Sequence, residues 1–540
     1  MLYDSLQVFK RQSHAEGERS LHESTWDEAL RYYSPKDRII YENRTGQPKG
    51  EKKTEYIYDS VPEHAVKQFA TIIDGYLTPR NQKWHGLKSS NSDLMKIGRV
   101  ARWFEDSTDI LFRARYASRS NFAAQNNEAL RMLGMLGNGV LFIDEFKFGG
   151  IRYKSEHLYD VYFFEDEYGI VDTIHRKFVL TAANAANLFG KDAPDYIQRD
   201  ASEKPDNEYE FLHVVGPNKN RNVDSLGADR FAYVSCYYDC KMREKLRTSG
   251  YNTFPYCVYR DVTAPRDVYA TGAGQVALAD TKMLNLMNKT DIKASQRAVD
   301  PPILVASNIA LVRNKPGGIN VGGLTNDGRK LIDVLDTGAR VDISEVKMEQ
   351  RRNSIKDTFL INLFQLLVDS PEKTATQVLE ETREKGVLLT PLLGRLQSEG
   401  LDNLIQRELD IKLQQNALPP LPPELIEAEG EYDIMYESPL SRAQRAEEAV
   451  GIQRQLQFEL SIGALPQDFE LSYNMDEARR IIASANAVPF KVMLDPEEVQ
   501  ARQQQRAQQQ AMMQAAQMAP GLAKAAKDVN DITSEQAQAT

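Results

Sequence analysis

Cysteine and histidine are the residues whose spacing suggests metal chemistry. Cys236 and Cys240 lie four positions apart, and Cys257 and His213 could complete a set of four donors of the kind that zinc prefers. Positions 236 and 240, however, fall on one face of a predicted strand, where thiols pack as small apolar groups. We favour buried free thiols, because three cysteines in 540 residues fit a reducing compartment and no disulfide framework.

Motifs for catalysis are missing from the sequence. There is no G-x-x-x-x-G-K-[ST] phosphate loop, no H-E-x-x-H and no G-x-S-x-G in the chain. The seven histidines are scattered, and acidic pairs such as Glu380-Glu381 and Glu447-Glu448 are typical of solvated helix faces. We therefore predict that the protein is not an enzyme and binds no cofactor or metal.

Length and composition predict two to four packed units. The chain has 540 residues, of which 41% are hydrophobic and 27% charged, ordinary values for a soluble globular protein. No window offers the roughly 18 to 20 apolar residues of a membrane span, and the first residues lack the layout of a signal peptide. A net charge of −10 disfavours a tight grip on nucleic acid, but it does not exclude a protein that DNA passes by.

The chain is organised around residues 269–415, where two predicted helices enclose a β-rich insert. The first helix ends before Asp300-Pro301-Pro302, since proline excludes continued helix, and the return helix is expected from Ser344, a plausible N-cap. Each helix has one apolar stripe at helical spacing. The stripes are Val276, Ala279, Met283, Leu286, Met287 and Ile292, and then Met348, Ile355, Phe359, Leu363 and Leu366. Two such helices make a thin rod that needs neighbours, so we expect an oligomer.

The remaining elements follow from periodicity and turn residues. Helices are predicted at 3–33, 63–76, as one long zone from 91 to 136, at 181–189, 376–415 (kinked near 386–391), 442–460, 475–485 and 497–518. Strands are predicted at 140–143, 161–164, 170–174, 178–180, 209–215, 231–238, 303–305, 309–312 and 331–335, with a hairpin turn at Glu167-Tyr168-Gly169. The fold class is therefore α+β and mainly helical.

This order of parts resembles the portal (head-to-tail connector) proteins of short-tailed, T7-like bacteriophages over nearly the whole chain. The stretches that carry the resemblance are Arg119-Ser120-Asn121-Phe122 with Gly137-Asn138-Gly139, Tyr269 to Asn285, Thr374 to Glu380, and Leu393 to Glu399. The resemblance implies ten parts. They are an N-terminal helical part of the wing (1–138), an α/β wing unit (139–268), stem helix 1 (269–298), a clip (299–343), stem helix 2 (344–368), a tunnel loop (369–375), a kinked wing helix with a proline linker (376–423), a crown (424–494), a glutamine-rich barrel helix (495–520) and a disordered tail (521–540).

The resemblance also implies a function. Family members form a ring, expected here to have twelve subunits, at one capsid vertex; double-stranded DNA is packaged and ejected through its channel. A separate terminase large subunit would drive packaging, and tail adaptor, tail, major capsid and scaffolding proteins would be further partners. The protein would reside in the virion, after assembly in the host bacterial cytoplasm. Twelve copies at −10 give roughly −120, and like charge lets DNA slide without sticking.

Three sets of residues are candidate sites under this resemblance. The tunnel loop is Asp369, Ser370, Pro371, Glu372, Lys373 and Thr374, with Lys373 as phosphate contact; the alternative is an ordinary helix–helix turn. The basic stem residues Lys347, Arg351, Arg352 and Lys356 either line the channel or pair with Glu345, Glu349 and Asp357 of the same or a neighbouring helix, and pairing is favoured. The clip residues Arg313, Lys315, Arg329 and Lys330 are docking contacts or simply exposed turn residues.

Two other functions compete with this one. A structural adaptor of a virion would form helical assemblies without a DNA-wide channel. A nucleic-acid-processing enzyme with a degenerate site would need clustered carboxylates, and no spacing in the sequence suggests them. The glutamine-rich helix also has two competing interpretations, an ordered barrel or a frayed tail.

Overall fold

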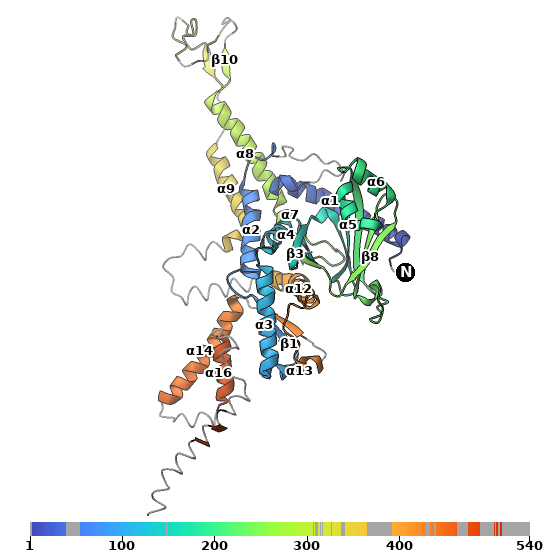
Figure 1. Cartoon of the computed structure of the whole chain (residues 1–540). Coiled ribbons are helices and arrows are strands. Elements are labelled where there is room, and N and C mark those ends of the chain that lie inside the picture. Colours follow the sequence, from blue (N-terminus) through green and yellow to red (C-terminus); the bar gives the residue numbers. More distant parts are fainter. Residues whose placement is uncertain are drawn as a thin grey trace, which may run out of the picture. The chain divides into compact units, whose positions relative to one another are not determined.

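The computed structural model describes residues 3–38, 54–146, 149–305, 307, 312–313, 315, 317–325, 327–335, 341–363, 391–427, 432–436, 439–461, 473–485, 502, 504–505 and 508–509. Figure 1 labels the helices and strands along the chain. The chain divides into two compact units. The first comprises Met1–Gln82 with Arg113–Gln415, and the second comprises Lys83–Phe112 with Asn416–Thr540. Helices and sheets are both present, so the predicted α+β class is confirmed.

Two antiparallel sheets form the centre of the first unit. One has the strand order β4 (Val161–Glu165), β5 (Val171–Thr181), β6 (Glu208–Pro217), β7 (Tyr233–Asp239), β8 (Lys245–Tyr251), and the other has the order β3 (Ile151–Glu156), β2 (Asn138–Glu145), β9 (Tyr256–Arg260). Helices cover both faces of the larger sheet. Phe211 of β6 packs with Phe189 and Ile197 of α5 (Ala182–Phe189) and α6 (Asp195–Glu203). Its neighbour Leu212 packs on the other face against Val8 of α1 (Ser5–Tyr33), because side chains alternate along a strand.

The strand predictions were correct in part. The hairpin at Glu167-Tyr168-Gly169 is confirmed, with Gly169 at φ 79° and the Asp166 carboxylate accepting from the amides of Tyr168 and Ile170. The predicted strands 170–174 and 178–180 are one strand, β5. Strands β3, β8 and β9 were not predicted. The edge strand β8 reads KLRTSGY and shows no apolar alternation, because none of its side chains is buried on either face.

The helical zone predicted from 91 to 136 is wrong as a single element. It consists of α3 (Gly98–Arg115) and α4 (Phe122–Leu136). Between them, the Asn121 side chain exchanges two hydrogen bonds with the backbone of Tyr153, at 2.7 and 3.1 Å. This contact joins the break between the two helices to strand β3. Sequence periodicity cannot reveal such a contact.

Two stretches of the family resemblance meet at the end of α4. Gly137 ends this helix at φ 78°, a conformation that glycine adopts without strain. A Cβ on Gly137 would lie 2.3 Å from the Ala270 carbonyl oxygen, and one on Gly272 would lie 2.4 Å from the Gly137 amide. The close backbone approach requires glycine at both positions and fixes the start of the stem.

The stem consists of α7 (Ala273–Val276) and α8 (Leu278–Val299), and of α9 (Val341–Thr358). The return helix thus begins before the predicted Ser344 and ends well before residue 368, at a turn where Leu360 has φ 60°. Between the helices, β10 (Ile303–Val305) pairs with β11 (Ile332–Val334). Most of the predicted strand 309–312 lies outside the described residues.

Residues 391–414 form a helix with a widened turn. Leu396–Leu401 is a π-helical turn, and α12 (Asp402–Gln414) follows it; such one-turn π insertions often mark functional positions. A helix over 376–415 was predicted, but residues 364–390, which include the predicted kink and the tunnel loop, lie outside the described part of the chain.

The second unit is held together by a strand pair that was not predicted. β1 (His85–Ser89) pairs antiparallel with β12 (Tyr432–Tyr436), and Trp84 stacks on Tyr436 with ring centroids 6.5 Å apart. The grouping of 83–112 with the C-terminal region differs from the predicted N-terminal wing part. Further helices are α13 (Pro423–Glu427), α14 (Pro439–Ser461) and α16 (Met475–Ala485); the last two confirm the helices predicted at 442–460 and 475–485. The barrel helix and tail lie almost entirely outside the described residues.

Candidate stem, channel and docking surfaces

The side of α8 that faces its own chain carries both apolar and polar side chains. Leu278 and Leu284 are buried there, and the Thr281 hydroxyl lies 2.8 Å from the Tyr33 hydroxyl. The Asn285 side chain donates to the Tyr56 carbonyl at 2.8 Å and accepts from the Tyr58 amide at 2.7 Å. One turn further, Asn288 donates to the Asp59 carboxylate at 2.5 Å. Two buried leucines and a row of side-chain hydrogen bonds therefore hold this part of the stem against the rest of the first unit.

The predicted apolar stripe of the first stem helix, which the structure divides into α7 and α8, is largely exposed. Val276 of α7 is 66% exposed, and Met283 and Leu286 of α8 are 48% and 64% exposed; Ala279 of the same stripe is exposed too. The stripe of the return helix is buried where the structure describes it, since Met348 and Ile355 of α9 and Phe359 just beyond it are buried.

The stem arginines pair within the chain. Arg351 bonds to Asp280 of α8 at 2.8 Å, and Arg352 bonds to Asp59 at 3.0 Å and to Glu349 at 3.3 Å. Pairing was the favoured interpretation, but Asp280 and Asp59 were not among the predicted partners. The two stem lysines are less enclosed, with Lys347 exposed and Lys356 partly exposed.

The clip cations are all on the surface. Arg313, Lys315, Arg329 and Lys330 are exposed beside turns in which Gly317 and Gly328 have φ 74° and 77°. This position fits a docking role and equally fits plain turn residues. The tunnel-loop residues Asp369 to Thr374 lie outside the described residues.

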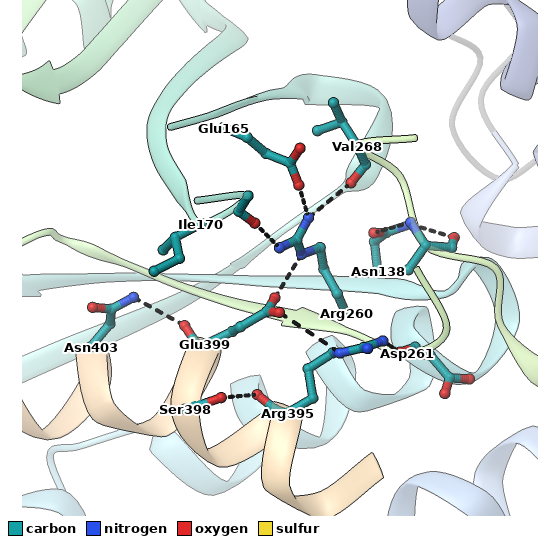
Figure 2. A network of polar contacts seen from close by, with 12 residues as sticks. Asn138, Glu165, Ile170, Arg260, Asp261, Val268, Arg395, Ser398, Glu399 and Asn403 are labelled. Carbon is teal, nitrogen blue, oxygen red and sulfur yellow. Dashed lines mark hydrogen bonds and ion pairs between the residues drawn. The ribbon is translucent and has the colours of Figure 1, made fainter. Parts of the chain in front are cut away.

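An arginine-centred network, missed by the sequence analysis, holds the helix of residues 391–414 (Figure 2). Arg260, at the end of β9, pairs with Glu165 and donates to the Glu399 carboxylate at 2.6 Å and to the Gly169 carbonyl at 2.8 Å. Arg395 donates to the Asp261 carbonyl at 2.5 Å. Burial raises the pKa of the Asp261 carboxyl to about 6 despite the nearby Arg395. The π turn is thus fastened to the end of β9 by Glu399 within the turn and by Arg395 just before it.

A second network lies further along the same helix and is completely buried. Arg115 reaches the two Glu408 oxygens at 2.9 and 2.5 Å, and the Tyr153 hydroxyl donates to Glu408 at 2.6 Å. Burial raises the pKa of Tyr153 well above its usual value, and the neighbouring carboxylate adds to the effect. Glu399 belongs to a stretch of the family resemblance, but only the fold reveals that it pairs with Arg260. The pairing of Glu408 with Arg115 is likewise visible only in the fold.

The cysteines and the histidine that suggested metal chemistry pack or form hydrogen bonds within the sheets. Cys236 is buried in β7 and Cys257 in β9, which belong to different sheets. His213 bonds through Nε2 to Ser235 at 2.8 Å and through Nδ1 to Tyr256 at 3.2 Å, and burial keeps its pKa well below the ordinary value. Within the described ranges, no three histidine, cysteine or acidic residues are grouped so as to hold a metal ion. The helices described also include none with the length and apolarity of a membrane span.

The chain is similar to known proteins over most of its length. A profile of the family described as "Bacteriophage head to tail connecting protein" matches residues 7–494. The "Probable portal protein" of Bordetella phage BPP-1 is 26% identical over 452 residues, covering 79% of this chain and 78% of the relative. The "Portal protein" of Salmonella phage epsilon15 is 23% identical over 535 residues, covering 97% and 95%.

Both relatives come from short-tailed phages unrelated to T7. The predicted family is therefore confirmed, while its T7-like subdivision gains no support. The profile spans residues 7–494 of the 540, and the chain therefore belongs to the bacteriophage head-to-tail connecting protein family.

Proposed function

We propose that the protein is a phage portal subunit, several copies of which form a ring at one capsid vertex. The observation that carries the proposal, beside family membership, is the outward apolar stripe of α7 and α8, with Val276, Met283 and Leu286 about half to two-thirds exposed. A stripe of exposed apolar side chains along a helix needs another molecule to cover it. Neighbouring subunits in a ring provide that cover at every position.

The ring conducts double-stranded DNA during packaging and ejection and acts as a structural protein, with no catalytic activity of its own. The net charge of −10 per chain supports transient DNA contact without tight binding. The head-to-tail connecting role implies capsid and tail partners. The terminase large subunit, tail adaptors, scaffolding protein, twelvefold symmetry and assembly in the host cytoplasm are finer parts of the proposal that rest on the sequence resemblance.

The predicted tunnel loop, Asp369 to Thr374, remains part of the proposal on sequence grounds alone. Lys373 is proposed to contact the DNA backbone in the channel. Replacing Lys373 by Glu should impair packaging or retention of DNA in the phage and leave ring assembly intact. Wild-type packaging and retention by K373E would remove this role from Lys373.

Single-particle imaging of the purified full-length chain tests the main proposal. We expect closed rings with rotational symmetry near twelve and a channel of about 20 Å or more, wide enough for duplex DNA. Monomers or open filaments would contradict the portal function and favour the alternative, an oligomeric structural adaptor that does not conduct DNA.

A further inference from the structure

The clip lacks an internal core in the part of the chain that the structure describes. No described side chain between Leu284 and Met348 is buried. Seven large apolar side chains of the clip are each about two-fifths or more exposed: Leu304, Val305, Ile319, Val321, Leu324, Val334 and Leu335. Together they present on the order of several hundred Å² of apolar surface, comparable to one partner's share of a protein interface.

The strand pair β10–β11 is also too small to be stable alone. Each strand has three residues, and among the described strands each pairs only with the other. An isolated two-stranded hairpin is at best marginally stable in water. Open strand edges with apolar side chains are, in addition, sites where further strands add.

The hydrogen-bond pattern shows which backbone groups face these edges. The Leu335 amide donates to the Pro302 carbonyl at 2.9 Å, and Leu304 lies opposite Asp333 in the register. Because residues in an antiparallel pair alternate between facing the partner and facing away, Ile303 and Val305 direct their amides and carbonyls to the outer edge of β10. Ile332 and Val334 do the same at the outer edge of β11, where the Val334 amide meets only the Asp333 carboxylate of its own strand.

We propose that the clips of neighbouring subunits join edge to edge, β11 of one copy beside β10 of the next, into one closed antiparallel sheet around the ring. A rotation of about 30° between neighbours, for roughly twelve copies, keeps β10 of each copy aligned with β10 of the next. Since β10 and β11 are antiparallel within the chain, β11 of one copy is antiparallel to β10 of its neighbour. Closure leaves no open strand edge and places the apolar side chains of β10 and β11 beside strands of the neighbouring copies.

The proposal rests on the ring proposed above and specifies a residue pair. At equal height, Leu304 of one copy lies opposite Asp333 of the next in a non-hydrogen-bonded pair, whose Cα atoms are about 4.5 Å apart, close enough for a disulfide. Leu304 and Asp333 are opposite each other within one chain as well. The two cysteines must therefore be carried by different chains.

The experiment uses full-length chains in which the half-buried Cys240 is replaced by serine. Chains with Leu304→Cys and chains with Asp333→Cys are coexpressed, purified as rings, oxidised and separated without reductant. We expect at least about tenfold more disulfide-linked dimer than in rings that mix Leu6→Cys, an exposed position on α1 (80%), with Asp333→Cys, because strand pairing raises the effective thiol concentration to the millimolar range.

The outcomes separate the two proposals. Rings seen by imaging but without 304–333 dimers above the control overturn the clip sheet and leave the portal ring standing. Dimers from Leu304→Cys chains alone, at the same level, also overturn it, since a two-fold contact and not a head-to-tail one would then join the clips. Failure to form rings overturns both.

Discussion

The guanidinium of Arg115 in α3 donates two hydrogen bonds to the carboxylate of Glu408 in α12, with N–O distances of 2.9 and 2.5 Å. Both side chains are completely excluded from solvent. These residues are 293 positions apart in the sequence. The pair therefore joins the N-terminal helices of the first unit to the helix that follows the predicted tunnel loop. A charge-assisted, two-point contact of this kind is strong in a dry environment, and its partners depend on each other.

Removing the arginine should destabilise the first unit severely. In Arg115→Met the Glu408 carboxylate would remain buried without its cation, which costs about 3–5 kcal/mol. Urea unfolding at fixed chain concentration measures the loss. The matched control is Glu63→Gln, which breaks the exposed Lys67–Glu63 pair and should change stability by less than about 1 kcal/mol. An Arg115→Met protein as stable as this control would show that the buried pair contributes little.

Two glycines of the 391–414 helix should respond oppositely to alanine. A Cβ on Gly400, inside the π turn, would lie 2.6 Å from the Tyr259 ring, whereas nothing lies within 4 Å of one on Gly394. We expect Gly400→Ala to lower the free energy of unfolding by about 1–3 kcal/mol through overpacking. Gly394→Ala should raise it by up to about 1 kcal/mol through helix propensity. Equal effects in thermal or urea unfolding would mean that the ring of Tyr259 yields freely.

Stability should fall in mild acid because of a buried histidine. His175 lies beside Gln12 at 2.9 Å, and burial, aided by Arg11, lowers its pKa from 6.5 to about 3. The unfolded chain therefore binds a proton between these values while the folded chain does not, so this contribution is complete above about pH 6.5 and is lost as the pH falls.

His175→Gln should flatten the stability curve between pH 6.5 and 4 by up to about 1.4 kcal/mol per pH unit. Urea titrations at several pH values measure the slope, with His14→Gln, at an exposed position (side chain 74% exposed), as the control. Parallel curves for H175Q and the natural chain would assign the acid sensitivity to other groups, among them the buried His213.

A charged side chain on the exposed apolar stripe of α8 should block ring assembly without unfolding the subunit. Leu286→Glu would place a carboxylate where we propose that a neighbouring subunit packs, and burying it there would cost several kcal/mol. We expect monomers by light scattering, with an unchanged circular dichroism spectrum. Leu6→Glu, on an exposed leucine of α1 (80%), should still give rings. If L286E formed rings at the same protein concentration as the natural chain, the stripe would not be part of the interface.

Sequence periodicity identified most helices and seven strands of the first unit, but it could not assign their surroundings. An apolar stripe shows that a helix is amphipathic and does not show which molecule covers the stripe, as Leu286 demonstrates. The missed strands had weak patterns, as in β8, or distant partners, as in β1. The networks around Arg260 and Glu408 were equally hidden, because a charged residue in a sequence gives no sign of being buried. The tunnel loop depends on the family resemblance alone.

The β1–β12 pair can form only late in the synthesis of the chain. Ser90 and Asp433, which bond side chain to side chain beside this pair, are 343 positions apart. At about 5–20 residues per second on the ribosome, β1 waits roughly 20 to 70 s for its partner strand. During that interval the nascent chain carries an unsatisfied strand, so slowed translation or scarce chaperones would reduce the yield of the second unit before that of the first.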